Sequence, residues 1–325
     1  MRSRGGTISI AVACACTVPA FAWVVAPLGW VFDLVACGTP QLTVLCGFAG
    51  AWFVIRRRLV AAAVCVVGVA SGLAGTLPGR SLATARASDT VSLLVYNAHV
   101  ENRAPERAHA LLRDTPVDVV VLIEPSAALL DAIRGDAELM DRLPSRWLPE
   151  RAGPGFMVVL SAWPQRSGKD WTDGPGGSVV RGMRVMVIER PGGPFALLAI
   201  HPDSPRTPGR WRSGNETVED ATAHVRDRLV PLGLPVVVAG DLNTSPTGAR
   251  ARALRRGTGL RQAKPLSVLA GTYPGSWPWP FSLAIDDALV SDGIGVAGWR
   301  TLDRAGSDHA PVLIHLVIPG VGSPE

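Results

Sequence analysis

Cysteine is absent from the chain after residue 77. All five cysteines precede that point, and they are Cys14, Cys16, Cys37, Cys46 and Cys65. The later part of the chain therefore uses neither disulfides nor thiolate metal ligands, which suits an oxidising exterior. Lysine is also scarce: apart from Lys169 and Lys264, every basic residue is an arginine. Positive charge is therefore carried almost entirely by guanidinium groups.

Charged side chains are rare at the beginning of the chain. The first 77 residues contain five arginines and one aspartate, so this section carries +4 of the formal net charge of +5. The remaining residues carry only +1. So small an excess of positive charge does not form the basic surface that nucleic-acid binding usually requires. The composition therefore weighs against a function that depends on nucleic-acid binding.

Three apolar runs fill the same early section: Thr7–Phe32, Gln41–Ile55 and Leu59–Leu77. A helix needs about 20 apolar residues to cross the hydrocarbon core of a membrane. The first run is long enough, the third is just long enough, and the second is short unless it takes in residues 34–40. We therefore predict that residues 1–77 form a membrane anchor of three transmembrane helices.

Two arginine clusters indicate the orientation of this anchor. Arg2 and Arg4 precede the first run, and residues 56–58 are three arginines between the second and third runs. The positive-inside rule places both clusters in the cytoplasm. We therefore expect a multi-pass protein of the cell membrane whose later domain is extracytoplasmic, although Arg80 and Arg86 oppose this mildly. Signal-peptide cleavage near residues 20–22 is an alternative that would leave fewer spans.

The rest of the chain divides by composition. Residues 78–89 are small and polar, as an exposed linker should be. Residues 90–318 are long enough for one domain with a sizeable core, and residues 319–325 form a tail.

Short β-branched runs alternate with turn-rich stretches in residues 90–318. Strands are predicted at Val91–Tyr96, Val117–Ile123, Phe156–Leu160, Val179–Ile188, Phe195–Ile200, Val236–Ala239, Ile285–Val290 and Val312–Leu316. Helices are predicted at Pro105–Arg113 and Asn215–Leu229. Many strands with few helices favour an α+β fold, in which sheets pack on each other with helices outside, over a doubly wound parallel sheet.

Polar side chains stand at the ends of these predicted strands. They are Asn97, Glu124, His201, Asp241, Asn243, Asp286, Asp308 and His309. Polar groups at the ends of buried strands can converge on one rim of the sheets, where a rigid scaffold can hold a site. This placement is the strongest indication of a site that the pattern alone provides.

Each of these residues taken singly has an ordinary structural explanation. If the chain stays extended through Gly240–Asn243, Asp241 and Asn243 project to the same side; the alternative is a β-turn. Glu124 closes an apolar run, and, if buried, it needs a metal or a basic neighbour. Asp286 and the adjacent Asp287 form a solvated pair in the alternative interpretation. The remaining polar residues are equally compatible with turns and capped strand ends.

Taken together, these residues supply the hard oxygen ligands that Mg²⁺ or Mn²⁺ prefers. The chain has no cysteine cluster or HExxH sequence that would indicate zinc. It also has no Walker-type GxxxxGK[ST] loop and no GxSxG nucleophile elbow. The combination therefore favours chemistry assisted by a divalent cation.

In its order of motifs the chain resembles the endonuclease/exonuclease/phosphatase superfamily, which includes deoxyribonuclease-I-like nucleases, sphingomyelinases and inositol-polyphosphate phosphatases. The resemblance covers residues 91–317. Within the superfamily, the chain resembles a membrane-anchored bacterial subgroup. Its motifs are VYNAHVEN from Val95, VDVVVLIEPS from Val117, IHPDSP from Ile200, GDLNTSP from Gly240, IDDALVS from Ile285 and GSDHAP from Gly306. It implies a four-layer α/β/β/α sandwich. One departure is Asp287, where the family often has an aromatic residue or histidine.

The resemblance also implies a role for each site residue in the hydrolysis of a phosphate ester by in-line attack of water. Asp241, oriented by Asn243, would activate the water, and His201 and His309 would stabilise charge on phosphate oxygens. Asp286 would orient His309. A metal ion would be held by Glu124, Asn97 and Asp308.

Several alternatives to this function remain at this stage. The expected substrate is a phosphate ester: a nucleic acid, a lipid headgroup or a small-molecule diester. DNA binding would normally require more Lys and Arg. The loop Thr272–Phe281 could rest at a membrane interface, where Trp is favoured, or its Trp side chains could pack on the domain. A catalytically inactive, membrane-bound interaction module is a third possibility. A transporter role is weaker, because the apolar runs offer only Asp33. No protein partner can be inferred.

Overall fold

The computed structural model describes residues 4–77, 79, 90–166 and 182–320. The chain forms two compact units. The first consists of Met1–Pro78 and Thr244–Arg252, and the second consists of Gly79–Asn243 and Ala253–Glu325. Residues 78 and 80–89 of the predicted linker and residues 321–325 of the predicted tail lie outside the described residues.

The first unit consists mainly of apolar helices. Its main elements are α1 (Arg4–Thr17), α2 (Ala22–Val25), α3 (Trp30–Cys37), α4 (Thr39–Ile55) and α5 (Leu59–Thr76). Two helical stretches, Gly6–Leu28 and Leu59–Thr76, are long and apolar enough to cross a membrane. A third span is formed if α3 and α4, which are bent by 61° at their junction, count as one. The shortest predicted run thus belongs to the bent pair.

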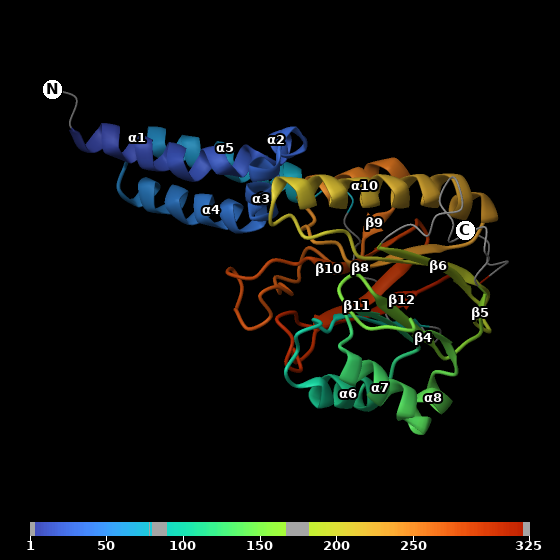
Figure 1. Ribbon diagram of the computed structural model, residues 1–325. Helices are drawn as coiled ribbons and strands as arrows, with labels where there is room; N and C mark the ends of the chain where they lie inside the picture. The colour runs from blue at the N-terminus through green and yellow to red at the C-terminus, as the bar shows by residue number, and fades with distance from the viewer. Residues whose placement is uncertain (1–3, 78, 80–89, 167–181, 321–325) are drawn as a thin grey trace. The chain divides into compact units, whose positions relative to one another are not determined.

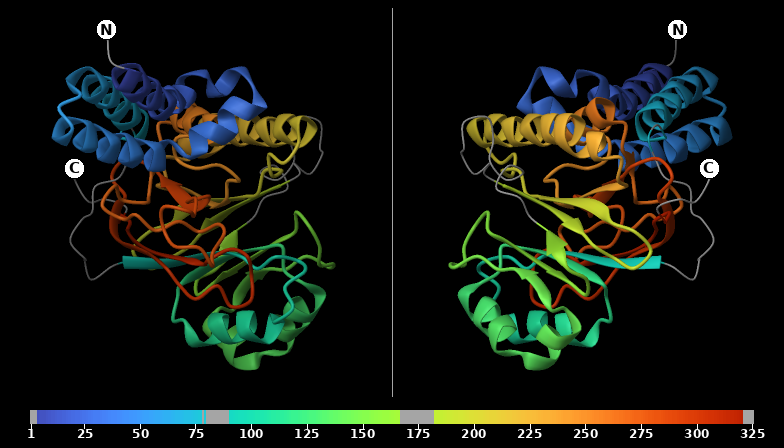
Figure 2. Two further views of the ribbon diagram at one scale, coloured as in Figure 1. Left: turned by 90° about the vertical axis from the view of Figure 1, so that its left-hand side faces the viewer. Right: turned by 90° about the vertical axis from the view of Figure 1, so that its right-hand side faces the viewer.

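The second unit contains two six-stranded mixed sheets, drawn in Figures 1 and 2. The first sheet has the order β11 (Gly295–Thr301), β12 (Val312–Val317), β1 (Thr90–Asn97), β2 (Val119–Ile123), β4 (Met157–Ser161) and β3 (Ser145–Trp147). The second has the order β5 (Gln165–Arg166), β6 (Met183–Ile188), β7 (Phe195–Ile200), β8 (Val236–Asp241), β10 (Asp286–Val290) and β9 (Arg261–Gln262). Each sheet contains one parallel pair, β1 with β2 and β7 with β8.

Helices cover the outer face of each sheet, as Figure 2 shows. The first sheet is covered by α6 (Pro105–Asp114), α7 (Ala127–Gly135) and α8 (Ala137–Arg142). The second is covered by α10 (Pro208–His224) and the π-helical turn Val225–Leu229, with Leu254 of α11 (Ala249–Thr258) in the same cluster. The predicted α+β sandwich of four layers is therefore confirmed.

Strand β1 shows why the strand sequences are almost continuously apolar. Val91, Leu93 and Val95 point into the core between the two sheets, where they join Leu197 of β7. Leu94 and the alternate residues of β1 point the other way, into the cluster beneath α6 and α7. Because both faces are buried, a polar residue has little place along such a strand except at its end.

Several sequence predictions of individual elements need correction. The helix predicted at Asn215–Leu229 begins earlier, at Pro208, because Thr207 caps it: the Thr207 side chain accepts a hydrogen bond from the Arg210 N–H. The prediction omitted strands β3, β5, β9 and β11 and helices α7, α8 and α11. Strands β3, β5 and β9 have only two or three residues, and β11 contains a glycine at a register shift. None of the four therefore shows a clear alternation of apolar and polar residues. Residues 179–181 of the predicted strand Val179–Ile188 lie outside the described residues.

Candidate active site

The sheet topology brings the predicted site residues to one place. Asn97 and Asp241 are the last residues of β1 and β8, while Glu124 and His201 directly follow β2 and β7. Strand β10 runs antiparallel to β8, so its first residue, Asp286, lies opposite Asp241 in the register. The ends of two parallel pairs and the start of an antiparallel strand thus share one edge, as the sequence predicted.

Asp241 lies at the centre of this cluster. Its side chain is buried, and its Oδ2 accepts a hydrogen bond of 2.9 Å from Asn97 Nδ2. The same oxygen lies 3.8 Å from Nε2 of His201 and 3.8 Å from Nε2 of His309. A β-carbon on the preceding Gly240 would collide with the Ile200 carbonyl oxygen, so only glycine allows β8 to approach β7 this closely.

Asn243 reaches Asp241 differently from the sequence prediction. Of the two possibilities for this segment, an extended chain or a turn, the extended chain does not apply, because Asn243 adopts a left-handed conformation with φ of 49°. Asparagine tolerates this conformation better than most residues. The backbone N–H of Asn243 donates to Asp241 Oδ1 at 2.8 Å, and its side-chain Nδ2 donates to the Pro202 carbonyl oxygen. Asn243 therefore fixes the Asp241 carboxylate through its backbone.

His309 is held firmly by Asp286. Its Nδ1 donates to Asp286 Oδ2 at 2.8 Å, and Asp286 is fully buried. Burial raises the pKa of Asp286. Burial alone would lower the pKa of His309, but the negative charges of Asp286, Asp241 and Asp308 outweigh that effect and raise the pKa to about 10. The raised pKa favours the charged form of His309, and the pairing with Asp286 leaves Nε2 of the ring 3.8 Å from Asp241 Oδ2.

The other side of Asp241 is formed by His201 and Glu124. Glu124 has a left-handed backbone, with φ of 50°, and its backbone N–H donates to the Phe156 carbonyl oxygen. Its carboxylate lies 3.8 Å from His201 Nε2. The Nδ1 atom of His201 is buried and has no hydrogen-bond partner among the described residues. Glu124 therefore lies at the same ring nitrogen of His201 that also faces Asp241.

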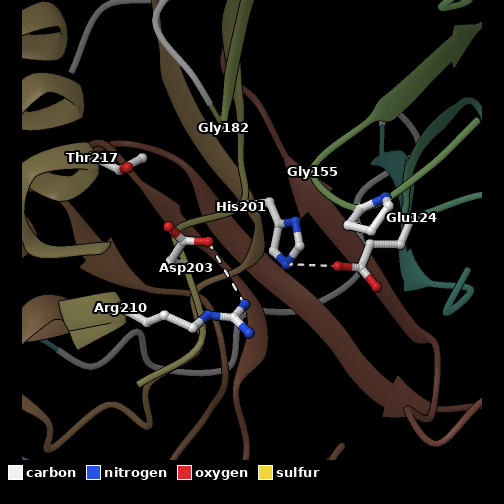
Figure 3. A pocket seen from close by; sticks show the side chains of 8 residues that line it. Glu124, Gly155, Gly182, His201, Asp203, Arg210 and Thr217 are labelled. Carbon is white, nitrogen blue, oxygen red and sulfur yellow. Dashed lines mark ion pairs between the residues drawn. The ribbon is translucent and has the colours of Figure 1, made fainter. Parts of the chain in front are cut away.

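A cavity of about 380 Å³ opens beside His201 and Glu124, as Figure 3 shows. In the figure, Arg210 and Thr217 approach from α10, opposite the loop that carries Gly155. An Arg210 Nη2 atom lies 3.6 Å from Asp203 Oδ1. The cavity is lined by Glu124, Pro154, Gly155, Gly182, His201, Asp203, Arg210 and Thr217. It is therefore a polar recess that adjoins the catalytic cluster.

The oxygen atoms of this cluster suit a hard divalent cation. Asp308 Oδ1 is buried without a hydrogen-bond partner among the described residues, although His99 Nδ1 lies 3.7 Å away. Asn97 Oδ1 accepts one hydrogen bond, from the His99 N–H, which leaves a second lone pair. Together with the Glu124 carboxylate, these are ligand atoms of the kind that Mg²⁺ prefers. That these three residues hold the metal remains a prediction.

A second set of potential ligand atoms belongs to Asp241, Asp286 and His309, whose atoms lie within 4.8 Å of one another. This set is less suited to a metal, because Asp286 Oδ2 and His309 Nδ1 already bond to each other. The bond leaves Asp286 Oδ1 buried and without a hydrogen-bond partner among the described residues. Asp286 and His309 are therefore already paired with each other, whereas the carboxylates of Glu124 and Asp308 are more open.

Three residues of the site were missed by the sequence analysis. His99 has a left-handed backbone, with φ of 59°, and lies beside Asp308. Thr272 accepts a hydrogen bond at Oγ1 from the Asp286 N–H, and the Tyr273 ring lies 4.9 Å from the His309 ring. His99 stands two residues after Asn97, which was the one available signal. The contacts of Thr272 and Tyr273 depend on a loop path that no local pattern indicates.

Asp287 has a different place from that of its neighbour. The solvated pair considered for Asp286 and Asp287 is wrong, because both side chains are buried. Asp287 points away from the site, where it accepts hydrogen bonds from Trp299 Nε1 at 2.7 Å and Gln262 Nε2 at 2.6 Å. The aspartate at this position, where the family often has an aromatic residue or histidine, therefore links β10 to side chains of β9 and β11 by hydrogen bonds.

The chain thus combines two sheets that have helices outside with a buried carboxylate–histidine cluster at their shared edge. Residues 94–309 match the Endonuclease/Exonuclease/phosphatase family, and the chain belongs to this family. The members of this family hydrolyse phosphoester bonds.

Solved structures share this fold. The chain is similar to an endonuclease/exonuclease/phosphatase of Beutenbergia cavernae DSM 12333, with 22% identity and a TM-score of 0.53 over 71% of this chain and 72% of that one. It is similar to a family protein of Bacteroides thetaiotaomicron, with 16% identity and a TM-score of 0.50 over 71% and 98%. It is also similar to the human Nocturnin catalytic domain, with 14% identity and a TM-score of 0.50 over 70% and 94%. No curated protein matches the chain.

Proposed function

We propose that this protein is a metal-dependent phosphoesterase that uses a water molecule to cleave a phosphate ester by in-line attack. The observation that carries the proposal is the arrangement around Asp241. A single buried carboxylate oxygen is approached by Asn97 and by the Nε2 atoms of His201 and His309. A base and two histidines that can contact phosphate oxygens are thus within reach of one substrate atom.

In this mechanism, Asp241 accepts a proton from the attacking water. The two hydrogen bonds from Asn97 Nδ2 and the Asn243 N–H hold its carboxylate in place for this step. His309 donates from Nε2 to a non-bridging oxygen of the phosphate, where negative charge develops. His201 donates to the same phosphate group from the other side. Asp286 keeps the His309 ring in the required orientation.

Glu124, Asn97 and Asp308 would hold the divalent cation. When bound, Mg²⁺ or Mn²⁺ would neutralise charge on the phosphate and on the leaving oxygen. The support is the donor set itself: two carboxylates and an amide carbonyl, which are hard oxygen ligands. A cation here would also balance the excess of carboxylates around Asp241.

The test is hydrolysis of bis-p-nitrophenyl phosphate by the full chain purified in detergent. We expect activity that requires added Mg²⁺ or Mn²⁺ and that falls by at least roughly a thousandfold in Asp241→Asn. Asp292→Asn is the matched control, because the Asp292 side chain is 88% exposed and pairs with Arg261, which lies outside the candidate site. Activity that persists in a chelator, or that survives in Asp241→Asn, would reject the mechanism.

We further propose that the catalytic unit faces the outside of the cytoplasm and acts on a phosphate ester there. The support is the pair of arginine clusters that flank the apolar helices. An alkaline phosphatase fused after residue 320 would be active only if the domain is exported. Salt-sensitive cleavage of DNA, without turnover of lipid headgroups, would instead favour the nuclease alternative. No metal binding at all would favour an inactive interaction module.

A further inference from the structure

Exposed apolar side chains in the catalytic unit concentrate on one connection, the segment between β9 and β10. Among the described residues of this unit, the large apolar side chains that remain exposed are Val230, Leu232, Leu266, Leu269, Trp277 and Phe281. The last four lie on this connection, drawn in orange in Figure 1. Trp277 is 58% exposed and Phe281 is 65% exposed. Two aromatic rings left this open to water require an explanation.

The connection also lacks charge completely. Residues 265–284 contain no Asp, Glu, Lys or Arg. An exposed loop normally carries polar and charged side chains. An uncharged run of 20 residues with exposed Trp, Phe and Leu therefore suits an apolar environment better than water.

The base of the connection is ordered by hydrogen bonds. Tyr273 and Leu283 form an antiparallel bridge, in which the Leu283 N–H donates to the Tyr273 carbonyl oxygen. The two exposed aromatic residues end consecutive turns: the Trp277 N–H donates to the Pro274 carbonyl oxygen, and the Phe281 N–H donates to the Pro278 carbonyl oxygen. These prolines restrict the backbone, so the fold holds the rings outward.

The same connection is attached directly to the catalytic cluster. The Gly275 N–H donates to the Asp308 carbonyl oxygen at 2.7 Å, and the Ala310 N–H donates to the Thr272 carbonyl oxygen at 2.8 Å. A β-carbon on Gly275 would collide with the backbone of His309 and Ala310. A surface that receives Trp277 and Phe281 therefore lies close to His309.

We propose that residues 265–284 dock onto the surface of a phospholipid bilayer through Trp277 and Phe281, and so bring the site to the phosphoesters of lipid headgroups. The bilayer is the partner that the chain itself indicates, because its first unit has two or three helices apolar enough to cross a membrane. Tryptophan and phenylalanine are favoured at the bilayer interface. The docking stands without the proposed function, whereas the choice of lipid headgroups rests on it.

The docking is tested by fluorescence quenching with the full chain reconstituted in phosphatidylcholine vesicles. Trp277 emission is obtained as the difference between the native protein and Trp277→Phe, which removes the contribution of the other nine tryptophans. We expect brominated phosphatidylcholine to quench at least about half of that difference, because bromine quenches only within the bilayer. The matched control is Leu232→Trp in the Trp277→Phe background, which places an exposed ring on a different turn and should remain unquenched.

A second measurement tests the substrate class. Trp277→Ala/Phe281→Ala should lower kcat/KM for phospholipid headgroups in vesicles by about tenfold, mainly through KM. Turnover of bis-p-nitrophenyl phosphate in solution should be unchanged, which also shows that the variant folds. Val230→Ser/Leu232→Ser is the control and should alter neither activity.

The outcomes separate this proposal from the proposed function. If brominated lipid leaves Trp277 emission unchanged, the docking is wrong, and a protein partner with an apolar pocket is the better explanation of the loop. If Trp277 is quenched but no phosphodiester is hydrolysed, the docking holds and the proposed function fails. Equal loss on vesicles and on the soluble diester would reject the role in substrate presentation.

Discussion

The two histidines on either side of Asp241 are equally distant from it but are held very differently. Both Nε2 atoms lie 3.8 Å from Asp241 Oδ2. The Nδ1 atom of His309 donates to a fully buried carboxylate, whereas Nδ1 of His201 has no partner among the described residues. Glu124 approaches His201 from the Nε2 side, where it competes with Asp241 for the same ring nitrogen.

This difference teaches that equal distance from a base does not mean an equal role. His309 has a fixed orientation and a raised pKa, so its charge is available before substrate arrives. His201 lacks such a partner at Nδ1 among the described residues, and its neighbour Glu124 is a candidate metal ligand. We therefore expect chemistry to depend most on the His309 side and cation binding to depend most on the Glu124 side.

The largest difference is expected when the His309–Asp286 pair is broken. His309→Ala and Asp286→Asn should each lower kcat by roughly 10²–10³-fold, because both remove the oriented donor to the phosphate. The double variant should cost little more than the larger single loss, since the two residues act as one unit. His201→Ala should cost about tenfold less than His309→Ala. Equal effects of the two histidine variants would remove the distinction between the two sides.

A smaller loss of activity is expected when Glu124 is changed, and this loss should depend on the concentration of the divalent cation. Glu124→Gln should raise the Mg²⁺ concentration for half-maximal activity by at least about tenfold, because it removes a charged ligand. Saturating Mg²⁺ should restore part of kcat. Glu150→Gln is the control, since Glu150 is exposed. An unchanged Mg²⁺ requirement in Glu124→Gln would move the metal site to other residues.

The raised pKa of His309 predicts how stability depends on pH in the metal-free protein. A folded-state pKa of about 10, above the ordinary value of 6.5, means that the charged imidazole stabilises the fold fully below about pH 6.5. This contribution is lost as the pH rises toward 10. Thermal unfolding in a chelator should therefore show stability falling between pH 7 and 10. His309→Gln should flatten that decline, and an identical slope would contradict the assignment.

The smallest effect on catalysis is expected at Asp287. Asp287→Asn should reduce the free energy of unfolding by about 1–3 kcal/mol, because the single oxygen of an amide cannot accept from the three N–H groups of Trp299, Gln262 and Lys264 that donate to the carboxylate. Its kcat should change by less than about threefold, since Asp287 points away from the site toward Trp299. Denaturant unfolding and the soluble-diester assay would measure the two effects separately. A large loss of kcat with unchanged stability would place Asp287 in the catalytic machinery.

Much of the fold followed from local pattern. Runs such as Phe195–Ile200 were predicted with the bounds that the structure shows, because both of their faces are buried and every residue is apolar. Strand β11 was missed because glycines interrupt it at a register shift. Its stability comes from pairing with β12, which no property of its own sequence reveals.

In the candidate site, too, the sequence predicted one part and only the structure supplied the other. Most of its members could be named from the chain, because together they form an ordered set of polar residues at the ends of apolar strands, although each one alone had an ordinary explanation. The pairing of Asp286 with His309, the left-handed turn at Asn243 and the contact of Tyr273 with His309 could not be read. Each joins segments that are distant in sequence or depends on a backbone angle. Strand order and loop path set those distances, and long-range packing settles them only when the whole domain folds.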